Sequence, residues 1–555
     1  MKCTFVLVIA FLALAVQCQK QTTYTDIIQT HKGPVRGRQA VTAFNEYEYS
    51  EFIGIPYAKP PLGDLRFKDS VEPDPWTEPV NATVEAPMCI QPFLLGTAGS
   101  ENCLYLNVYT PETDFGDMED LRPVLVWIYG GAFELGGILQ AMYGPDWFIE
   151  DDIVVVAMNY RLGALGFLAL QHPDAPGNQA LKDQILALQW VQKNIAKFGG
   201  DPNKVTIMGE SAGAAMVMYH VLSPMSTGLF HQAIAQSGSP LCPWAYKPPT
   251  VSNVAAYELG AILGIAAANN THLLDRLKRQ PAIDIVQGSN RVSVANGFTP
   301  IIIPFAPTIE VGTENPFMPQ CPISLLQSGK FNKVPVLLGY NADETVLFDI
   351  AGEIFRTQLH ALMRFLNNFF DPFGSSQYLV DVMDKIANGT QKEMLKVGSS
   401  VMFNAPIDLT QKLLSKHNGD KPIYYYRLSF NTPKNLHRLI QPRLEGTAHC
   451  DDLPLLFHVG LFNPADPDAP YNQYSKRVAS LWTNFIKYTD PTPRNNTVSK
   501  ANWAPSTKKG RQLDIGNEEF KMHDRLADHM DHKLSHMYST IWPTCSECKH
   551  SHNKQ

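Results

Sequence analysis

The sequence lacks the features that mark fibrous, nucleic-acid-binding and membrane-spanning chains. Its 555 residues include no low-complexity tract, heptad run or fixed-period repeat. Hydrophobic residues make up 45% and charged residues 18%, the balance of an ordinary globular protein. The net charge is only -7 and the basic residues are scattered, which argues against a nucleic acid partner. After the N-terminus, no apolar stretch is long enough to span a bilayer.

The N-terminus has the pattern of a secretory signal peptide. Lys2 precedes the apolar run at residues 5–16, and Val16-Gln17-Cys18 offers small residues for cleavage. We therefore expect a signal peptide at residues 1–18 and a mature chain at residues 19–555. The polar C-terminal tail, about residues 543–555, shows neither a hydrophobic anchor signal nor a retention tetrapeptide. These features predict a secreted, extracellular protein without a membrane anchor.

In an exported protein, cysteines can form disulfides and asparagine sequons can be glycosylated. Four asparagines, at Asn81, Asn269, Asn388 and Asn495, are candidate glycosylation sites. Seven cysteines follow the expected cleavage site, at positions 89, 103, 242, 321, 450, 545 and 548. Disulfides persist outside the cytosol, and an odd number leaves one thiol free or paired between chains. The sequence leaves the pairing of Cys242, Cys321, Cys450, Cys545 and Cys548 open.

The C-terminal tail also has metal-ligand spacing. Cys545, Cys548, His550 and His552 follow a helical segment that carries His529, His532 and His536. Two cysteines near a secreted C-terminus are more typical of oxidised or disordered chain, so we expect no metal there. No cofactor is expected either.

Short aliphatic runs alternate with helical patterns, which predicts an α/β fold with a parallel sheet and crossover helices. The strands are expected at residues 124–129, 153–158, 205–208, 334–338 and 423–428. A helix is expected from Leu181 to Phe198, ending at Gly199-Gly200, and another over residues 353–370. No linker divides the chain, so we expect one large domain with a mostly parallel, twisted central sheet flanked by helices.

The motif Gly209-Glu210-Ser211-Ala212-Gly213 lies between the expected strand at residues 205–208 and a run of small residues. This is the context of a nucleophile elbow, where a tight strand-to-helix turn exposes a serine hydroxyl. Glycines on either side are needed because the turn leaves no room for side chains. Ser211 is therefore the candidate nucleophile, rather than an ordinary turn serine.

A serine hydroxyl needs a neutral imidazole as base, and the imidazole needs a carboxylate to orient it. Of the downstream histidines, His449 lies in a loop of small residues after the strand at residues 423–428. Asp343 and Glu344 both follow the strand at residues 334–338, and their positions leave either as the acid. An oxyanion hole is expected from the amide of Ala212 and the glycine-rich loop at residues 129–133.

With these residues, the chain resembles the type-B carboxylesterases, the family that includes the cholinesterases, and most closely the secreted carboxylesterases of insects. The resemblance extends from Phe52–Ala58 to Leu481–Phe485. Its specific signatures are Phe198-Gly199-Gly200-Asp201-Pro202 before the elbow, and Glu101–Val108.

The resemblance implies an α/β-hydrolase fold and a serine esterase acting through an acyl-enzyme on small-molecule esters. It implies the triad Ser211, Glu344 and His449, with Glu344 preferred over Asp343 because the family's acid is the glutamate of an Asp-Glu pair. It also implies oxyanion donors at Gly131, Ala132 and Ala212, and a disulfide between Cys89 and Cys103.

The chain departs from the family at four places, three of which bear on function. Ala132 replaces a common glycine, which narrows the expected acyl pocket, and Asn102 replaces an aspartate away from the chemistry. Cholinesterases hold a choline-binding tryptophan between the first cysteine pair, whereas here residues 90–102 contain none, which disfavours acetylcholine. Glu210 differs from the glutamine typical of juvenile hormone esterases.

Two alternatives stay open besides a general esterase: a catalytically silent, neuroligin-like binding protein and a specialised hormone or pheromone esterase. The first is disfavoured because all three triad residues are present. A further hypothesis makes Cys450, directly after the proposed base, the free thiol near the substrate gorge. The physiological ester and the oligomeric state are left open.

Overall fold

The computed structural model describes residues 23–541, except 94–95, 117, 119, 296–302, 353–354, 358, 361–376, 440–441, 465 and 495–500. The expected signal peptide, the tail with Cys545, Cys548, His550 and His552, the sequon at Asn495 and most of the helix expected over residues 353–370 lie outside these residues. Among the described residues, no helix combines the length and apolar character needed to cross a membrane.

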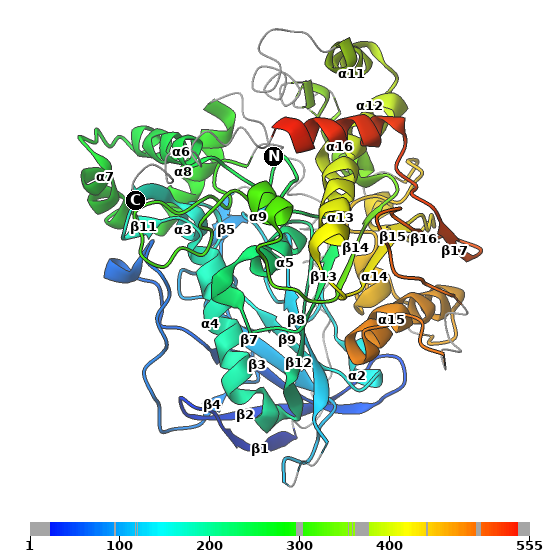
Figure 1. Cartoon of the computed structure of the whole chain (residues 1–555). Coiled ribbons are helices and arrows are strands. Elements are labelled where there is room, and N and C mark those ends of the chain that lie inside the picture. Colours follow the sequence, from blue (N-terminus) through cyan, green and yellow to red (C-terminus); the bar gives the residue numbers. More distant parts are fainter. Residues whose placement is uncertain are drawn as a thin grey trace.

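A large central sheet organises the molecule (Figure 1). Its strand order is β1-β2-β3-β7-β9-β8-β12-β13-β14-β15-β16-β17, and β4 pairs with β2. The seven strands from β9 to β16 in this order are parallel. Toward both edges neighbouring strands are antiparallel, except that β4 is parallel to β2. Its strands are β1 Tyr24–Gln29, β2 Pro34–Val41, β3 Glu48–Pro56, β4 Val80–Asn81, β7 Tyr105–Thr110, β8 Arg122–Ile128, β9 Val154–Met158, β12 Gly200–Glu210, β13 Gln232–Gln236, β14 Val336–Asn341, β15 Ile423–Leu428, β16 Gln512–Ile515 and β17 Phe520–His523. This is the mostly parallel, twisted sheet of the α/β-hydrolase fold.

The central strands form because their sequences are apolar on both faces. Strands β9 and β13 are buried at every residue, and β8 is buried from Val124 to Ile128. A parallel strand covered by helices on both sides gains apolar burial at each position, so it has no polar alternation. The strands expected from sequence match β8, β9, β14 and β15 within a few residues, and β12 begins earlier, at Gly200.

Helices cover both faces of the sheet, and Figure 1 shows α6, α7 and α8 as one group and α11, α12 and α16 as another, both away from β1. The longer helices are α4 Gln179–Asn194, α5 Ala212–Leu222, α6 Pro249–Ile262, α7 Asn270–Lys278, α8 Ala282–Ala295, α11 Gln377–Asn388, α12 Gln391–Ser399, α13 Ala405–His417, α15 Pro470–Tyr488 and α16 His529–Ile541. The shorter α-helices are α2 Asp146–Glu150, α3 Gly163–Phe167, α9 Pro322–Ser328 and α14 Leu453–Leu456.

Helix α4 shows how the chain is directed into the strand that carries the site. It continues into a 3-10 turn at Ile195–Phe198, and Gly199 ends that turn with a φ of 78°. Glycine adopts this left-handed conformation without steric penalty. Strand β12 begins at the next residue, Gly200, and runs through the sheet to Glu210.

Candidate active site

Ser211 lies where β12 ends and α5 begins. Its φ of 59° is unusual for a non-glycine residue. Its N–H donates to the carbonyl of Gln236 at 2.8 Å, and its own carbonyl accepts the N–H of Ala215 at 3.0 Å. A Cβ on Gly213 would lie 2.1 Å from the carbonyl oxygen of Ile128, so only glycine allows α5 to leave the sheet this close to β8. The sharp turn expected at Ser211 is therefore present.

The three side chains predicted as a triad lie in one hydrogen-bonded chain. Nε2 of His449 lies 2.8 Å from Oγ of Ser211, and Nδ1 lies 2.7 Å from Oε2 of Glu344. The N–H of His449 also donates to the carbonyl of Glu344 at 3.0 Å. His449 and Glu344 are buried, and Ser211 is partly exposed. These residues come from three separate strand ends, after β12, β14 and β15.

The structure separates the two candidate acids. Oε1 of Glu344 accepts the N–H of Asn341 at 2.8 Å, so both carboxylate oxygens have partners. Asp343 instead accepts the N–H of Thr447 at 3.2 Å and thereby ties down the loop that leads to His449. Glu344 is the carboxylate that contacts the imidazole, and Asp343 supports the loop.

Glu210 is a third carboxyl group at the site, one whose role the sequence did not reveal. Its Oε1 lies 3.2 Å from Nε2 of His449, and the thiol of Cys450 donates to the same oxygen at 3.3 Å. Burial raises the pKa of Glu210 to about 8, against the opposing charge of His449. Burial lowers the pKa of His449, whereas the carboxylates of Glu210 and Glu344 raise it, and the raising effects are larger. A protonated Glu210 no longer raises the pKa of His449, so the imidazole is more often neutral, the form that a general base needs before it takes the serine proton.

The glycine-rich loop lies beside Ser211. Gly131 and Ala132 line the same cavity as Ser211, and both have a positive φ, 108° and 56°. The N–H groups of Gly131 and Ala132, and that of Ala212 at the start of α5, donate no hydrogen bond within the described part of the chain. Three unused backbone donors near one serine hydroxyl suit the stabilisation of an oxyanion.

A cavity of about 220 Å³ opens onto these groups. Most of its lining is apolar, and the side chains that give it this character are Phe93, Leu135, Met142, Tyr143, Leu347, Phe348, Leu436, Leu453, Val459 and Phe462. Among the described residues that line it, the ionisable ones are Glu210, His449, Tyr143 and Cys450. The apolar part of such a cavity favours an uncharged, apolar ligand.

Aromatic rings that sequence reasoning missed hold the imidazole. The ring of Phe403 lies 4.7 Å from that of His449, and the ring of Phe348 lies 5.9 Å from it. Phe403 belongs to a π-helical turn at Ser400–Asn404 between α12 and α13. Such turns occur frequently at functional sites, but they carry no short-range sequence signal.

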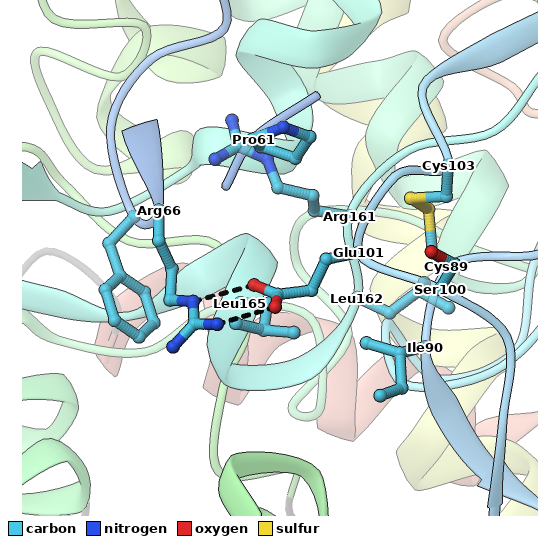
Figure 2. A pocket seen from close by; sticks show the side chains of 11 residues that line it. Pro61, Arg66, Cys89, Ile90, Ser100, Glu101, Cys103, Arg161, Leu162 and Leu165 are labelled. Carbon is cyan, nitrogen blue, oxygen red and sulfur yellow. Dashed lines mark hydrogen bonds and ion pairs between the residues drawn. A yellow bond between two sulfur atoms is a disulfide. The ribbon is translucent and has the colours of Figure 1, made fainter. Parts of the chain in front are cut away.

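Cys89 and Cys103 are joined by a disulfide, and the loop between them is bonded to the chain just after the glycine-rich loop. The side chain of Gln91 exchanges two hydrogen bonds with the backbone of Gly136, at 2.7 and 2.8 Å. Figure 2 shows the guanidinium of Arg66 pointing at Glu101 beside this disulfide, where it donates two hydrogen bonds at 2.6 and 2.7 Å. The depression there has a volume of only about 10 Å³, so this pair is structural.

Cys450 lies beside the triad, and the other cysteines and histidines described below lie away from it. Cys242 and Cys450 are free, Cys242 buried and Cys450 partly exposed in the cavity, while Cys321 is disulfide-bonded. His220 is buried between Gln184 and Ser226, and His437 pairs with Asp451. Among the described residues, one group of three could hold a metal ion: Glu210, His449 and Cys450.

Two solved esterase structures are similar to this chain. The structure of juvenile hormone esterase from Manduca sexta, with OTFP covalently attached, has a TM-score of 0.82 and is 26% identical, covering 94% of this chain and 100% of its own. A thermophilic pNB esterase has a TM-score of 0.75 and is 26% identical, covering 92% of this chain and 99% of its own.

Three relatives found by sequence have a higher identity to this chain than these two structures do. Juvenile hormone esterase of Tribolium castaneum is 34% identical over 85% of this chain and 84% of its own length. Cholinesterase of Mus musculus is 33% identical over 90% and 85%, and esterase FE4 of Myzus persicae is 32% identical over 88% of both. The model of the carboxylesterase family matches residues 24–534. The chain therefore belongs to the carboxylesterase family and is a carboxylic ester hydrolase.

Proposed function

We propose that this protein is a secreted serine carboxylesterase with Ser211 as nucleophile, His449 as general base and Glu344 as supporting acid. One observation carries the proposal: an unbroken hydrogen-bonded chain from Ser211 Oγ through His449 to Glu344 opens onto an apolar cavity. A serine hydroxyl in contact with an oriented, buried imidazole is the arrangement that activates serine as a nucleophile.

In the first half of the reaction, Oγ of Ser211 attacks the ester carbonyl while Nε2 of His449 takes its proton. The carboxylate of Glu344 holds Nδ1 protonated and stabilises the imidazolium. The N–H groups of Gly131, Ala132 and Ala212 stabilise the developing oxyanion. His449 then gives the proton to the departing alcohol, and an acyl-enzyme ester on Ser211 is left.

In the second half, water replaces the alcohol. His449 accepts a proton from water as the oxygen attacks the acyl carbonyl, and returns it to Oγ of Ser211 when the acid leaves. No cofactor takes part in either step. The apolar lining of the cavity points to neutral esters, because a charged group would lose hydration there without a paired side chain.

The test is hydrolysis of p-nitrophenyl acetate, butyrate and longer acyl esters by wild type and Ser211→Ala. We expect kcat to fall by roughly 10⁴–10⁶ in the variant, with an unchanged circular dichroism spectrum. Mass spectrometry should also find an organophosphate adduct on Ser211. Folded wild type with neither turnover nor adduct would overturn the proposal in favour of the silent, neuroligin-like alternative.

A specialised hormone esterase is the second candidate, favoured by the two juvenile hormone esterases among the relatives and by the apolar cavity. Glu210 in place of the glutamine expected for such enzymes counts against it. Measured kcat/KM for juvenile hormone and p-nitrophenyl butyrate decides between the two. A clear preference for the hormone supports specialisation, and a preference for the simple ester supports a general esterase.

Secretion is supported by the N-terminal sequence and by exposed sequons. Asn81, Asn269 and Asn388 are all exposed in the structure. Expression of the full chain in insect cells should give medium-borne protein that begins near residue 19 and loses mass on treatment with peptide N-glycosidase. Retention of the protein in the cells with its N-terminus intact would contradict this part of the proposal.

A further inference from the structure

Three side chains of different ligand chemistry converge on one point beside Ser211. The carboxylate of Glu210, the imidazole of His449 and the thiol of Cys450 place ligand atoms within 4.8 Å of one another. Proton transfer by His449 explains why the imidazole is there, but it gives no reason for a thiol. Sulfur, nitrogen and oxygen ligands together are the set that Zn²⁺ accepts and that harder ions such as Mg²⁺ do not.

The distances suit a tetrahedral ion. Oε1 of Glu210 lies 3.2 Å from Nε2 of His449 and 3.3 Å from Sγ of Cys450. Bond lengths of about 2.0–2.3 Å to zinc place two tetrahedral ligand atoms about 3.3–3.6 Å apart. The two pairs that include Glu210 therefore already have this spacing. Sγ of Cys450 and Nε2 of His449 lie within 4.8 Å of each other, and side-chain rotation of Cys450 would bring this pair to the same spacing.

His449 is already oriented as a metal ligand. Zinc-binding histidines typically donate their second ring nitrogen to a carboxylate, which fixes the tautomer and leaves the first nitrogen free to bind the ion. Nδ1 of His449 makes this contact with Glu344 at 2.7 Å, and Glu344 is held by the N–H of Asn341. The feature that makes Nε2 a base thus also prepares it to bind a cation.

Cys450 has a strained backbone and a thiol that is accessible from the cavity. Its φ is 69°, a left-handed conformation that costs a non-glycine residue about 1 kcal/mol or more. The thiol is free of any disulfide and lines the same cavity as Glu210, Ser211 and His449, so an ion in the cavity can reach it. The carboxyl groups of Glu344 and Asp452 lie close enough to act electrostatically on both Glu210 and His449, which favours a cation at this place.

We propose that Glu210, His449 and Cys450 form an inhibitory site for a thiophilic divalent cation of the Zn²⁺ and Cd²⁺ class. The proposal deepens the proposed function, on which the inhibitory part rests. Bonds form from the ion to Sγ, Oε1 and Nε2, and the thiol proton, with any proton on Glu210, passes to solvent. The ion occupies the lone pair of His449 Nε2, which must accept the proton of Ser211, so hydrolysis stops until the ion leaves.

The test combines inhibition with direct binding. Wild type, Cys450→Ser and Cys450→Gly are titrated with Zn²⁺ during ester hydrolysis, each compared with its own activity without metal. The glycine variant suits the positive φ and guards against a folding defect in the serine variant. Cd²⁺ binding is followed separately by ultraviolet thiolate-to-metal charge-transfer absorption. We expect both variants to need at least about tenfold more Zn²⁺ for half inhibition and to lose the Cd²⁺ band.

Cys242→Ala is the matched control because Cys242 is the other free cysteine in the part of the chain that the structure describes, and it is fully buried. It should be inhibited and bind Cd²⁺ like wild type, and Mg²⁺ should inhibit none of these proteins. Equal Zn²⁺ inhibition of wild type and both Cys450 variants would overturn the site, as would an active wild type that Zn²⁺ does not inhibit. The charge-transfer band separates the two proposals, because a Cys450-dependent band in a protein without esterase activity would refute the proposed function alone.

Discussion

Oε2 of Glu344 lies 2.7 Å from Nδ1 of His449, at the end of a hydrogen-bonded chain that begins at Ser211. An amide in place of this carboxylate would no longer stabilise the imidazolium. We expect Glu344→Gln to lower kcat by about 10³–10⁴, with little change in KM, for p-nitrophenyl butyrate. Asp343→Asn is the matched control, because Asp343 contacts Thr447 and not the imidazole. Similar losses of kcat in both variants would contradict the assignment of the acid.

The elbow depends on close contact between α5 and β8 at Gly213. A Cβ there would lie 2.1 Å from the carbonyl oxygen of Ile128, so the start of α5 would have to shift away from β8. We expect Gly213→Ala to lower kcat/KM by at least about 10² because Ser211 is displaced, and to lower the melting temperature. Gly96→Ala, where a Cβ meets nothing within 4 Å, should resemble wild type in both measurements. A fully active Gly213→Ala would refute the contact.

Ala132 has a positive φ of 56° and lines the cavity beside the proposed oxyanion donors. Ala132→Gly keeps the N–H, relieves the backbone strain and widens the acyl side of the cavity. We expect kcat/KM for branched or long acyl esters to rise up to about tenfold relative to the acetate, and stability to be maintained. An unchanged ratio of acyl preferences between variant and wild type would show that the Ala132 methyl does not shape the pocket.

His220 should make stability depend on pH. Burial lowers its pKa to about 3, so the folded protein keeps it neutral while the unfolded chain protonates it below about pH 6.5. The unfolded state then binds more protons. The free energy of unfolding therefore falls as pH falls from 6.5 toward 3, by up to about 1.4 kcal/mol per pH unit for this one group. Above this range the group is neutral in both states and contributes no slope.

His220→Gln removes this titration and retains a side chain able to bond Gln184 or Ser226. Urea unfolding of both proteins at about pH 7 and about pH 5 should show a smaller fall in midpoint for the variant. The comparison cancels the other groups that titrate in the same range. Parallel falls in the two proteins would mean that His220 does not carry the predicted pH dependence.

Local sequence was sufficient for the elements around Ser211. Apolar and β-branched residues at 205–208, a glycine two positions either side of Ser211 and a following run of small residues predict strand, turn and helix from short-range sterics alone. Helix α4 and the end of the following 3-10 turn at Gly199 followed in the same way from apolar spacing and glycine chemistry. These features are local, so neighbours along the chain carry their whole signal.

The acid that acts with Ser211 and His449 could not be assigned from local sequence. Asp343 and Glu344 are adjacent in sequence and chemically alike, and residue patterns alone left them equivalent; the family resemblance favoured Glu344. Their separation comes from packing, because the Asn341 N–H and the imidazole of His449 enclose the Glu344 carboxylate while Thr447 takes Asp343. Phe403 and Phe348 against His449 had no sequence signal at all.

The sequence by itself thus determined the alternation of strands and helices and the serine turn, since these arise from interactions within a few residues. Tertiary structure decided which carboxylate reaches His449, and which rings hold the imidazole. It also decided that a thiol, a carboxyl and an imidazole meet beside Ser211. Residues 210, 344 and 449 come together only when β12, β14 and β15 lie in one sheet, because their strand ends then open onto the same cavity.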